Sequence, residues 1–166
     1  MNTPHLKVKK PRPNLSVVGW MEHIDLPDLS LSRVKVKFDT GARTSALHAM
    51  QIQTFTRDGE PWVRFHVDIE VAPPEHWVEA PIFDIRHIKN TGGVPEERIV
   101  IQTSIKIAGR TWPIAVSLTD RSNMRLPMIV GRTALKKQNI AVHTRKTNLA
   151  ADKRHPMPNG QKGFSK

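Results

Sequence analysis

The chain has 166 residues, with 26 Lys and Arg against 15 Asp and Glu, for a net charge of +11. This length suits one domain with tails, and the absence of cysteine excludes disulfides, thiolate metal sites and thiol nucleophiles. No apolar run approaches the roughly 18 residues that span a bilayer, and the basic N-terminus lacks the apolar region of a secretory signal. The sequence therefore predicts a cytoplasmic protein without a membrane segment.

The positive charge is concentrated at the two ends of the chain. Residues 1–14 carry four Lys and Arg and no acid, and residues 144–166 carry six against one Asp. We predict a basic flexible tail at 1–14, a folded domain at 15–143 and a second basic flexible tail at 144–166. The tails either aid solubility or tether the chain to an anionic surface such as ribosomal RNA or an acidic peptide. No recognition helix or zinc-finger spacing indicates sequence-specific nucleic-acid binding.

Strands dominate the predicted domain, since the β-branched residues Val and Ile are abundant. Apolar patterning predicts extended segments, in chain order, at 15–21, 34–38, 46–56, 62–71, 77–86, two within 99–118 and one at 128–130. Turns are expected at 26–29, at the Asp-Gly of 57–60 and at 108–110, and the composition of 133–138 is helical. The fold class is therefore all-β, a small closed barrel with one short helix.

The run VKVKFDTGARTSALHA contains Asp39-Thr40-Gly41 directly after the strand predicted at 34–38. The strand delivers a carboxylate into a sharp turn, and glycine tolerates backbone angles that other residues rarely adopt. A carboxylate at a strand end, beside a small hydroxyl and a glycine, is typical of half of an aspartic-protease site. The alternative is an Asp that only caps a turn.

A second motif, LPMIVGRTALKKQNIAV, follows about ninety residues later and combines a short strand, Gly131 and a helix-like segment. In this order of motifs the chain resembles the retropepsins, the single-domain aspartic proteases of retroviruses. It resembles more closely a bacterial family labelled ATP-dependent zinc proteases and now regarded as retropepsin-like. The matching stretches are VVGW at 17–20, FDTGARTSALHA at 38–49, EERIVIQTSIKIAGRTWPIAVSLTDRSNM at 96–124 and IVGRTALKKQNIAV at 129–142.

The resemblance implies an acid-protease barrel in which Asp39 is catalytic and Thr40, Gly41 and Ala42 form the active-site loop. Peptide hydrolysis by carboxylates needs two of them sharing one proton, and this chain has one Asp-Thr-Gly. The resemblance therefore implies a homodimer that brings two Asp39 side chains together, since two-fold dimers are the commonest oligomers.

Four residues are expected to contact substrate: Arg43, Gly92, Gly93 and Arg132. The Gly92-Gly93 loop stands where the retropepsin flap is found, although a plain surface loop is the alternative. Retroviral proteases place an acid after Asp-Thr-Gly-Ala, paired with the later arginine, whereas this chain has Arg43 there as well as Arg132. Two arginines cannot satisfy each other, so either Asp120 or a substrate carboxylate is expected to pair with one of them.

The eight His show neither HExxH nor helical i, i+4 spacing, and there is no P-loop, so the sequence predicts no metal site and no cofactor. The family label points to association with glutamate ligases and the ribosome, and hence to a peptide or protein substrate such as a glutamate-tailed ribosomal protein. The leading hypothesis is a homodimeric aspartic endopeptidase. The alternatives are a non-catalytic binding module for an acidic partner and the zinc-dependent protease of the family label.

Overall fold

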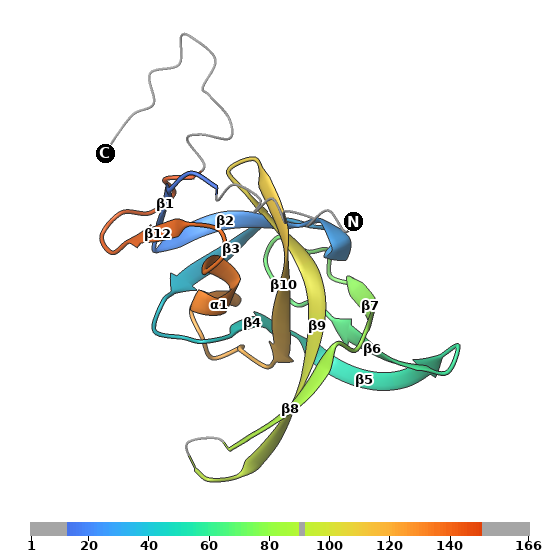
Figure 1. Cartoon of the computed structure of the whole chain (residues 1–166). Helices are drawn as coiled ribbons and strands as arrows, with labels where there is room; N and C mark the ends of the chain where they lie inside the picture. Colours follow the sequence, from blue (N-terminus) through green and yellow to red (C-terminus); the bar gives the residue numbers. More distant parts are fainter. Residues whose placement is uncertain (1–12, 90–91, 151–166) are drawn as a thin grey trace, which may run out of the picture.

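The computed structural model describes residues 13–89 and 92–150, most of which lie in strands (Figure 1). The elements are, in chain order, β1 (Ser16–Gly19), β2 (Met21–Leu26), η1 (Pro27–Leu29), β3 (Leu31–Asp39), β4 (Ser45–His48), β5 (Met50–Arg57), β6 (Glu60–His66), β7 (Trp77–Pro81), β8 (Asp84–Lys89), β9 (Pro95–Ile107), β10 (Arg110–Thr119), β11 (Met128–Gly131), α1 (Arg132–Leu135) and β12 (Ile140–His143). The all-β prediction with one short helix is confirmed.

A closed barrel forms the body of the molecule. Strands β10, β4, β11, β3, β2 and β9 are hydrogen-bonded in that order, and β9 pairs in turn with β10, which closes the ring. Strand β8 extends the sheet beyond β9 as a hairpin that projects from the barrel (Figure 1). Strands β5, β6 and β7 form a separate three-stranded sheet, and β1 pairs in parallel with β12.

The order of β3, β11 and β4 sets the position of the Asp-Thr-Gly turn. Strand β11 lies between β3 and β4, which are neighbours in sequence, and pairs in parallel with β3 and antiparallel with β4. In this register Gly131 stands opposite Asp39. The two motifs singled out in the sequence therefore end side by side at one end of the barrel.

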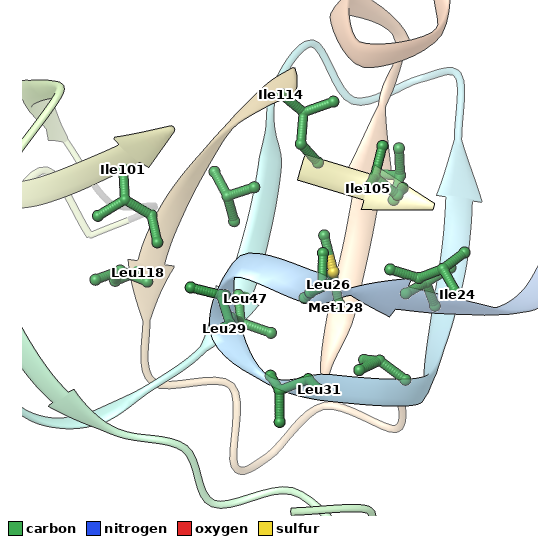
Figure 2. Close-up of a cluster of buried hydrophobic side chains, with 14 of the residues drawn as sticks. Ile24, Leu26, Leu29, Leu31, Leu47, Ile101, Ile105, Ile114, Leu118 and Met128 are labelled. Carbon is green, nitrogen blue, oxygen red and sulfur yellow. The ribbon is translucent and has the colours of Figure 1, made fainter. Parts of the chain in front are cut away.

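Aliphatic side chains fill the barrel. Figure 2 shows Ile24 and Leu26 of β2, Leu47 of β4 and Met128 of β11 meeting in one cluster, and all four are fully buried. Burying each such side chain contributes about 1.5–3 kcal/mol. This core holds the strand ends, and with them the turn at Asp39, in a fixed arrangement.

The strand predicted at 46–56 is interrupted in the structure. Strand β4 ends at His48, Ala49 donates its N–H to the carbonyl of Thr119, and β5 continues in a different sheet. Gln51, with φ of 51°, lies within a register shift at the start of β5. Strand β4 is buried throughout, whereas no residue of β5 is fully buried, and the apolar residues Ile52 and Phe55 continue the pattern past the break, so patterning alone did not reveal it.

Four other predicted segments differ from the observed elements. The strand predicted at 15–21 includes β1 and the start of β2, the strand predicted at 77–86 includes β7 and the start of β8, and two more predicted segments were too long. The strand predicted at 62–71 ends at His66, after which Val67 bonds to the carbonyl of His76 and the chain turns before Pro73. The helix predicted at 133–138 is the single turn α1. Each element ends where its regular pattern of backbone hydrogen bonds stops.

Packed structure continues past residue 143, where the sequence analysis placed the end of the domain. Trp20 donates its N–H to the carbonyl of Lys146, Asn148 donates to Met21, and Ala150 is buried. Within the described part of the chain, no helix has the length and apolar character needed to cross a membrane. The predicted tails at 1–12 and 151–166 lie outside the described residues.

Candidate active site

Asp39 is the last residue of β3, and its two carboxylate oxygens have different surroundings. Oδ1 accepts hydrogen bonds from the backbone N–H of Gly41 at 3.0 Å and of Ala42 at 3.2 Å. Oδ2 lies 3.7 Å from Nζ of Lys37, and the Asp39 side chain is 32% exposed. The turn thus fixes one oxygen through its own amide groups and leaves the carboxylate accessible from outside.

The junction between β11 and α1 holds the Asp39 loop from the other side. Arg132 donates its N–H to the carbonyl of Ala42 at 2.9 Å and its Nη1 to the carbonyl of Gly41 at 3.2 Å. Thr133 donates its hydroxyl to the carbonyl of Arg43 at 2.6 Å. Three consecutive carbonyls of the loop are therefore anchored by two residues of the second motif.

Two further contacts tie this junction to β4. Ser45 is buried and accepts the N–H of Gly131 through its Oγ at 3.0 Å. A Cβ atom at Gly131 would lie 2.6 Å from the backbone carbonyl of Thr44, a distance that side chains do not tolerate. Glycine is required here because two backbones approach closely. Ser45 was not singled out in the sequence, although it stands within the first motif, whereas the helix beginning at Thr133 was expected to support the Asp39 loop.

Two cavities flank the loop. One, of about 570 Å³, is lined by Thr40, Arg43, Arg132 and Lys136 among others. The other, of about 510 Å³, shares Arg43 and adds Arg86 of β8 and Arg98 of β9. We call the surface formed by these five cationic side chains the basic cleft: Arg43, Arg86, Arg98, Arg132 and Lys136.

Two of these cations have a carboxylate partner nearby, and others have none among the described residues. Arg86 pairs with Asp84 at 3.2 Å, and Arg98 approaches Glu96 at 3.6 Å. Nε of Arg98 is buried and has no hydrogen-bond partner among the described atoms. The structure likewise gives Arg43 no ion pair within the described ranges. The basic cleft therefore has more cationic capacity than its own carboxylates satisfy.

Asp120 is not the partner of Arg43 or Arg132, which corrects one expectation. Its Oδ1 accepts the N–H and the hydroxyl of Ser122, at 2.9 and 2.6 Å, and lies 3.8 Å from Nδ1 of His48. The hydroxyl and amide hydrogen bonds from Ser122 hold the pKa of Asp120 below its ordinary value. Asp120 lies beyond the end of β10 that is paired with His48, whereas Arg43 precedes the opposite end of β4.

Gly92 and Gly93 lie on the β8–β9 hairpin, as the sequence suggested, and Gly93 has φ of 76°. The two cavities that flank the loop are lined by neither Gly92 nor Gly93. The same hairpin instead contributes Arg86 and Arg98, which were missed because their proximity to Arg43 depends on strand register. The substrate contacts expected of Gly92 and Gly93 stay a prediction.

No group of three or more His, Asp and Glu side chains within residues 13–89 and 92–150 is arranged to hold a metal ion. What the described site can do follows from its charges. It offers one accessible carboxylate, held by backbone amides and within ion-pair distance of Lys37, next to a loop that borders the basic cleft. The basic cleft can bind an acidic ligand, and a carboxylate held in this way has the chemistry needed for one half of a two-carboxylate site.

The chain has relatives among known proteins. It is 39% identical over 121 residues to a protein named probable alpha-L-glutamate ligase from Desulfotalea psychrophila, a match that covers 72% of this chain and 26% of that protein. A protein of the same name from Shewanella pealeana is 35% identical over 133 residues, covering 76% of this chain and 28% of the relative. The chain thus spans about a quarter of the length of these relatives.

Fold and family comparisons agree with the geometry. A crystal structure of a Legionella pneumophila protein of unknown function superposes with a TM-score of 0.67 at 29% identity, covering 81% of this chain and 98% of that one. The family model described as "Retropepsin-like aspartic endopeptidase RimB" matches residues 17–153. Because this match includes the Asp-Thr-Gly turn, the inserted strand and the whole barrel, the chain belongs to the RimB-like family of retropepsin-like aspartic endopeptidases.

Proposed function

We propose that the chain is an aspartic peptidase that acts as a two-fold homodimer, with Asp39 as its catalytic residue. The observation that supports this most directly is the state of the Asp39 carboxylate. One oxygen is fixed by two amide groups of its own turn, and the side chain stays about one-third exposed at the edge of the barrel. An Asp that only caps a turn would not require β11 between β3 and β4, nor the bonds from Arg132 and Thr133 that hold its loop.

The dimer is a chemical requirement of the proposed activity. Two carboxylates about 3 Å apart cannot both ionise, so they share one proton. The ionised Asp39 of one protomer takes a proton from the attacking water, while the protonated Asp39 of its partner donates to the oxygen of the scissile carbonyl. The tetrahedral intermediate then collapses: the Asp39 that took the proton from water passes it to the leaving amine, and the other Asp39 takes a proton from a hydroxyl of the intermediate as the carbonyl re-forms. Each chain contributes one Asp39 loop, so a monomer lacks the second carboxylate.

The basic cleft supports an acidic peptide as the substrate class. Arg43 and Arg98 present guanidinium groups beside the Asp39 loop, and guanidinium groups bind carboxylates through two parallel hydrogen bonds. The relatives named probable alpha-L-glutamate ligase contain a region similar to this chain. A glutamate-extended peptide, such as a glutamate-tailed ribosomal protein, is therefore the substrate that we propose, with a glutamate ligase or the ribosome as partners.

Cleavage of an oligo-glutamate peptide tests the proposal. The wild-type chain should hydrolyse the peptide, and the Asp39→Asn variant should bind it without cleaving it, because the amide cannot act as the base. Circular dichroism and light scattering of both chains provide the control for folding and dimerisation. Hydrolysis that persists in Asp39→Asn would remove Asp39 from the mechanism.

The same assay in excess chelator addresses the zinc-dependent alternative. An Asp-based peptidase keeps its rate in chelator, whereas a metalloprotease loses activity and regains it when zinc is added.

Thr40, which is exposed beside Asp39, allows a test of the proposed dimer contact. Thr40→Val should weaken the dimer if the two loops meet there, without changing the fold of the monomer.

A non-catalytic binding module is the second candidate. The ion pair between Lys37 and Asp39 favours it, because in a single chain this cation offsets the charge of the carboxylate. In this case the chain stays monomeric at micromolar concentration, and it holds acidic peptides without cleaving them. Molar mass from light scattering, measured together with hydrolysis, separates the two candidates.

A further inference from the structure

A second concentration of cationic side chains lies at the other end of the barrel from the Asp39 loop. It surrounds a cavity of about 620 Å³ whose lining includes Arg33 and Lys35 of β3, His48 of β4, and Arg121 and Arg125 after β10. Asp68 and Glu70 also line it. Four permanently charged cations thus face two carboxylates, and no ion pair joins them within the described part of the chain.

His48 is the most buried polar side chain of this cavity, with an exposed fraction of 5%. Its Nδ1 accepts the backbone N–H of Arg121 at 2.8 Å, so the neutral ring carries its proton on Nε2. Nε2 has no hydrogen-bond partner among the described residues. A ring that is fixed through one nitrogen and lines a cavity presents a directed donor for an anionic oxygen.

Arg121 adds a partly desolvated cation beside that donor. Its guanidinium donates to the carbonyl of Leu126 through Nε and Nη2, at 3.4 and 3.3 Å. Burial and the nearby charge of Arg98 both lower the pKa of Arg121. A cation that is deprived of water and close to a second cation gains from a bound carboxylate.

The outer face of β3 connects this cavity to the Asp39 loop. Side chains two residues apart on a strand share a face, and Lys35, Lys37 and Asp39 lie on the outer face of β3, whose intervening residues are buried. Lys35 and Asp39 are separated by about 14 Å, since a strand rises about 3.4 Å per residue. An extended acidic peptide of about five residues spans this distance.

We propose that the cavity formed by Arg33, Lys35, His48, Arg121 and Arg125 is a second binding site for the acidic peptide, which anchors a stretch remote from the Asp39 loop. The proposal rests on the acidic-peptide substrate class proposed above. Lys37 lies between the two sites and continues the positive potential along β3. A long acidic peptide then occupies both sites at once, and its affinity exceeds that of a short one because the second contact is intramolecular.

The test compares fluorescein-labelled oligo-glutamates of two lengths, a 4-mer and a 12-mer, by fluorescence anisotropy in about 50 mM salt. The Asp39→Asn chain is used so that the peptides stay intact. In this background Lys35→Gln/Arg125→Gln removes two exposed charges of the cavity. The matched control Lys106→Gln/Lys137→Gln removes two exposed charges that line none of the three cavities.

We expect the cavity pair to weaken 12-mer binding by roughly 2- to 30-fold relative to the control pair, because each exposed ion pair contributes about 0.2–1 kcal/mol. The advantage of the 12-mer over the 4-mer should shrink accordingly. Equal affinities of the two double variants for the 12-mer would overturn the inference.

The readout separates this inference from the peptidase proposal. Binding is measured in a chain that does not hydrolyse, so it does not depend on dimeric catalysis. A failed second site shows as equal 12-mer binding by the cavity and control variants. A failed peptidase proposal shows instead as absent hydrolysis by the chain with Asp39 intact.

Discussion

Glu22 is a fully buried carboxylate that fastens the segment after β12 to the barrel. Its Oε2 accepts the N–H of Gly19 at 2.6 Å, of Leu149 at 3.0 Å and of Ala150 at 3.2 Å. The described residues place no cation within ion-pair distance of it. The backbone amides therefore supply its main stabilisation.

Glu22→Ala removes the acceptor of three amide groups at once. Hydrogen bonds to a charged group contribute about 1.5–3 kcal/mol each. Their simple sum is about 5–9 kcal/mol, but water that enters the vacated space offsets part of it. We expect the free energy of unfolding to fall by about 3–5 kcal/mol, a large share of the 5–15 kcal/mol typical of a domain.

Urea unfolding measures this loss, and limited trypsin digestion after Arg145 and Lys146 reports whether the segment is released. Glu22→Gln keeps one acceptor oxygen in a side chain of the same size, so it should lose less than Glu22→Ala. Glu75→Ala removes an exposed carboxylate and should stay within about 0.5 kcal/mol of wild type. If Glu22→Ala loses less than 1 kcal/mol and leaves the digestion rate unchanged, the segment is held by other contacts.

Two other changes address the Asp39 loop and its support, and a third addresses Asp120 at the opposite end of β4. Gly131→Ala places a methyl group 2.6 Å from the backbone of Thr44, so we expect a loss of about 1–3 kcal/mol in stability and a larger loss of peptide cleavage. Arg43→Ala should weaken binding of a glutamate peptide by about 1–3 kcal/mol and leave a neutral peptide nearly unaffected. Ser122→Ala should raise the pKa of Asp120 towards its ordinary value, as NMR titration can measure. Because that pKa is lowered in the folded chain, the stability advantage of wild type over Ser122→Ala is present above about pH 4 and is lost as pH falls further.

Each of these changes has a control variant or an outcome that would contradict it. Gly109→Ala adds a methyl group with nothing within 4 Å, although its φ of 74° carries a backbone cost of its own, so it should lose stability without losing cleavage. Equal losses of both peptides in Arg43→Ala would assign Arg43 to the fold of the loop. An unchanged Asp120 titration in Ser122→Ala would mean that water replaces the hydroxyl.

Local patterns predicted the strands and the Asp39 turn because both depend on short-range rules, whereas the closed barrel was expected from the resemblance to retropepsins. Strand alternation, the Asp-Gly turn and the glycine after the carboxylate can be read within about ten residues. The positive φ values of Asp58 and Gly59, and of Ala108 and Gly109, confirm the two predicted hairpin turns. The order of the motifs then indicated the family, which the comparisons confirm.

The basic cleft was only partly predictable because it depends on register. Arg86 stands opposite Arg98 in the β8–β9 hairpin, and both face Arg43, which is more than forty residues away in sequence. No spacing rule connects these positions. Glu22, in contrast, left a signal that was overlooked. It alternates with Ile24 and Leu26 on the buried face of β2, and a carboxylate on such a face needs partners.

The charges around Asp39 oppose one another in the proposed reaction. A pair of acidic side chains repels an acidic peptide, and Lys37, Arg43 and Arg132 offset that repulsion on each protomer. The same cations are brought together when two chains of net charge +11 pair through their Asp39 loops. An acidic peptide bound across both loops removes this second repulsion. Substrate binding should then strengthen dimerisation, and dimerisation should strengthen substrate binding by the same factor, because coupling between two binding equilibria is reciprocal.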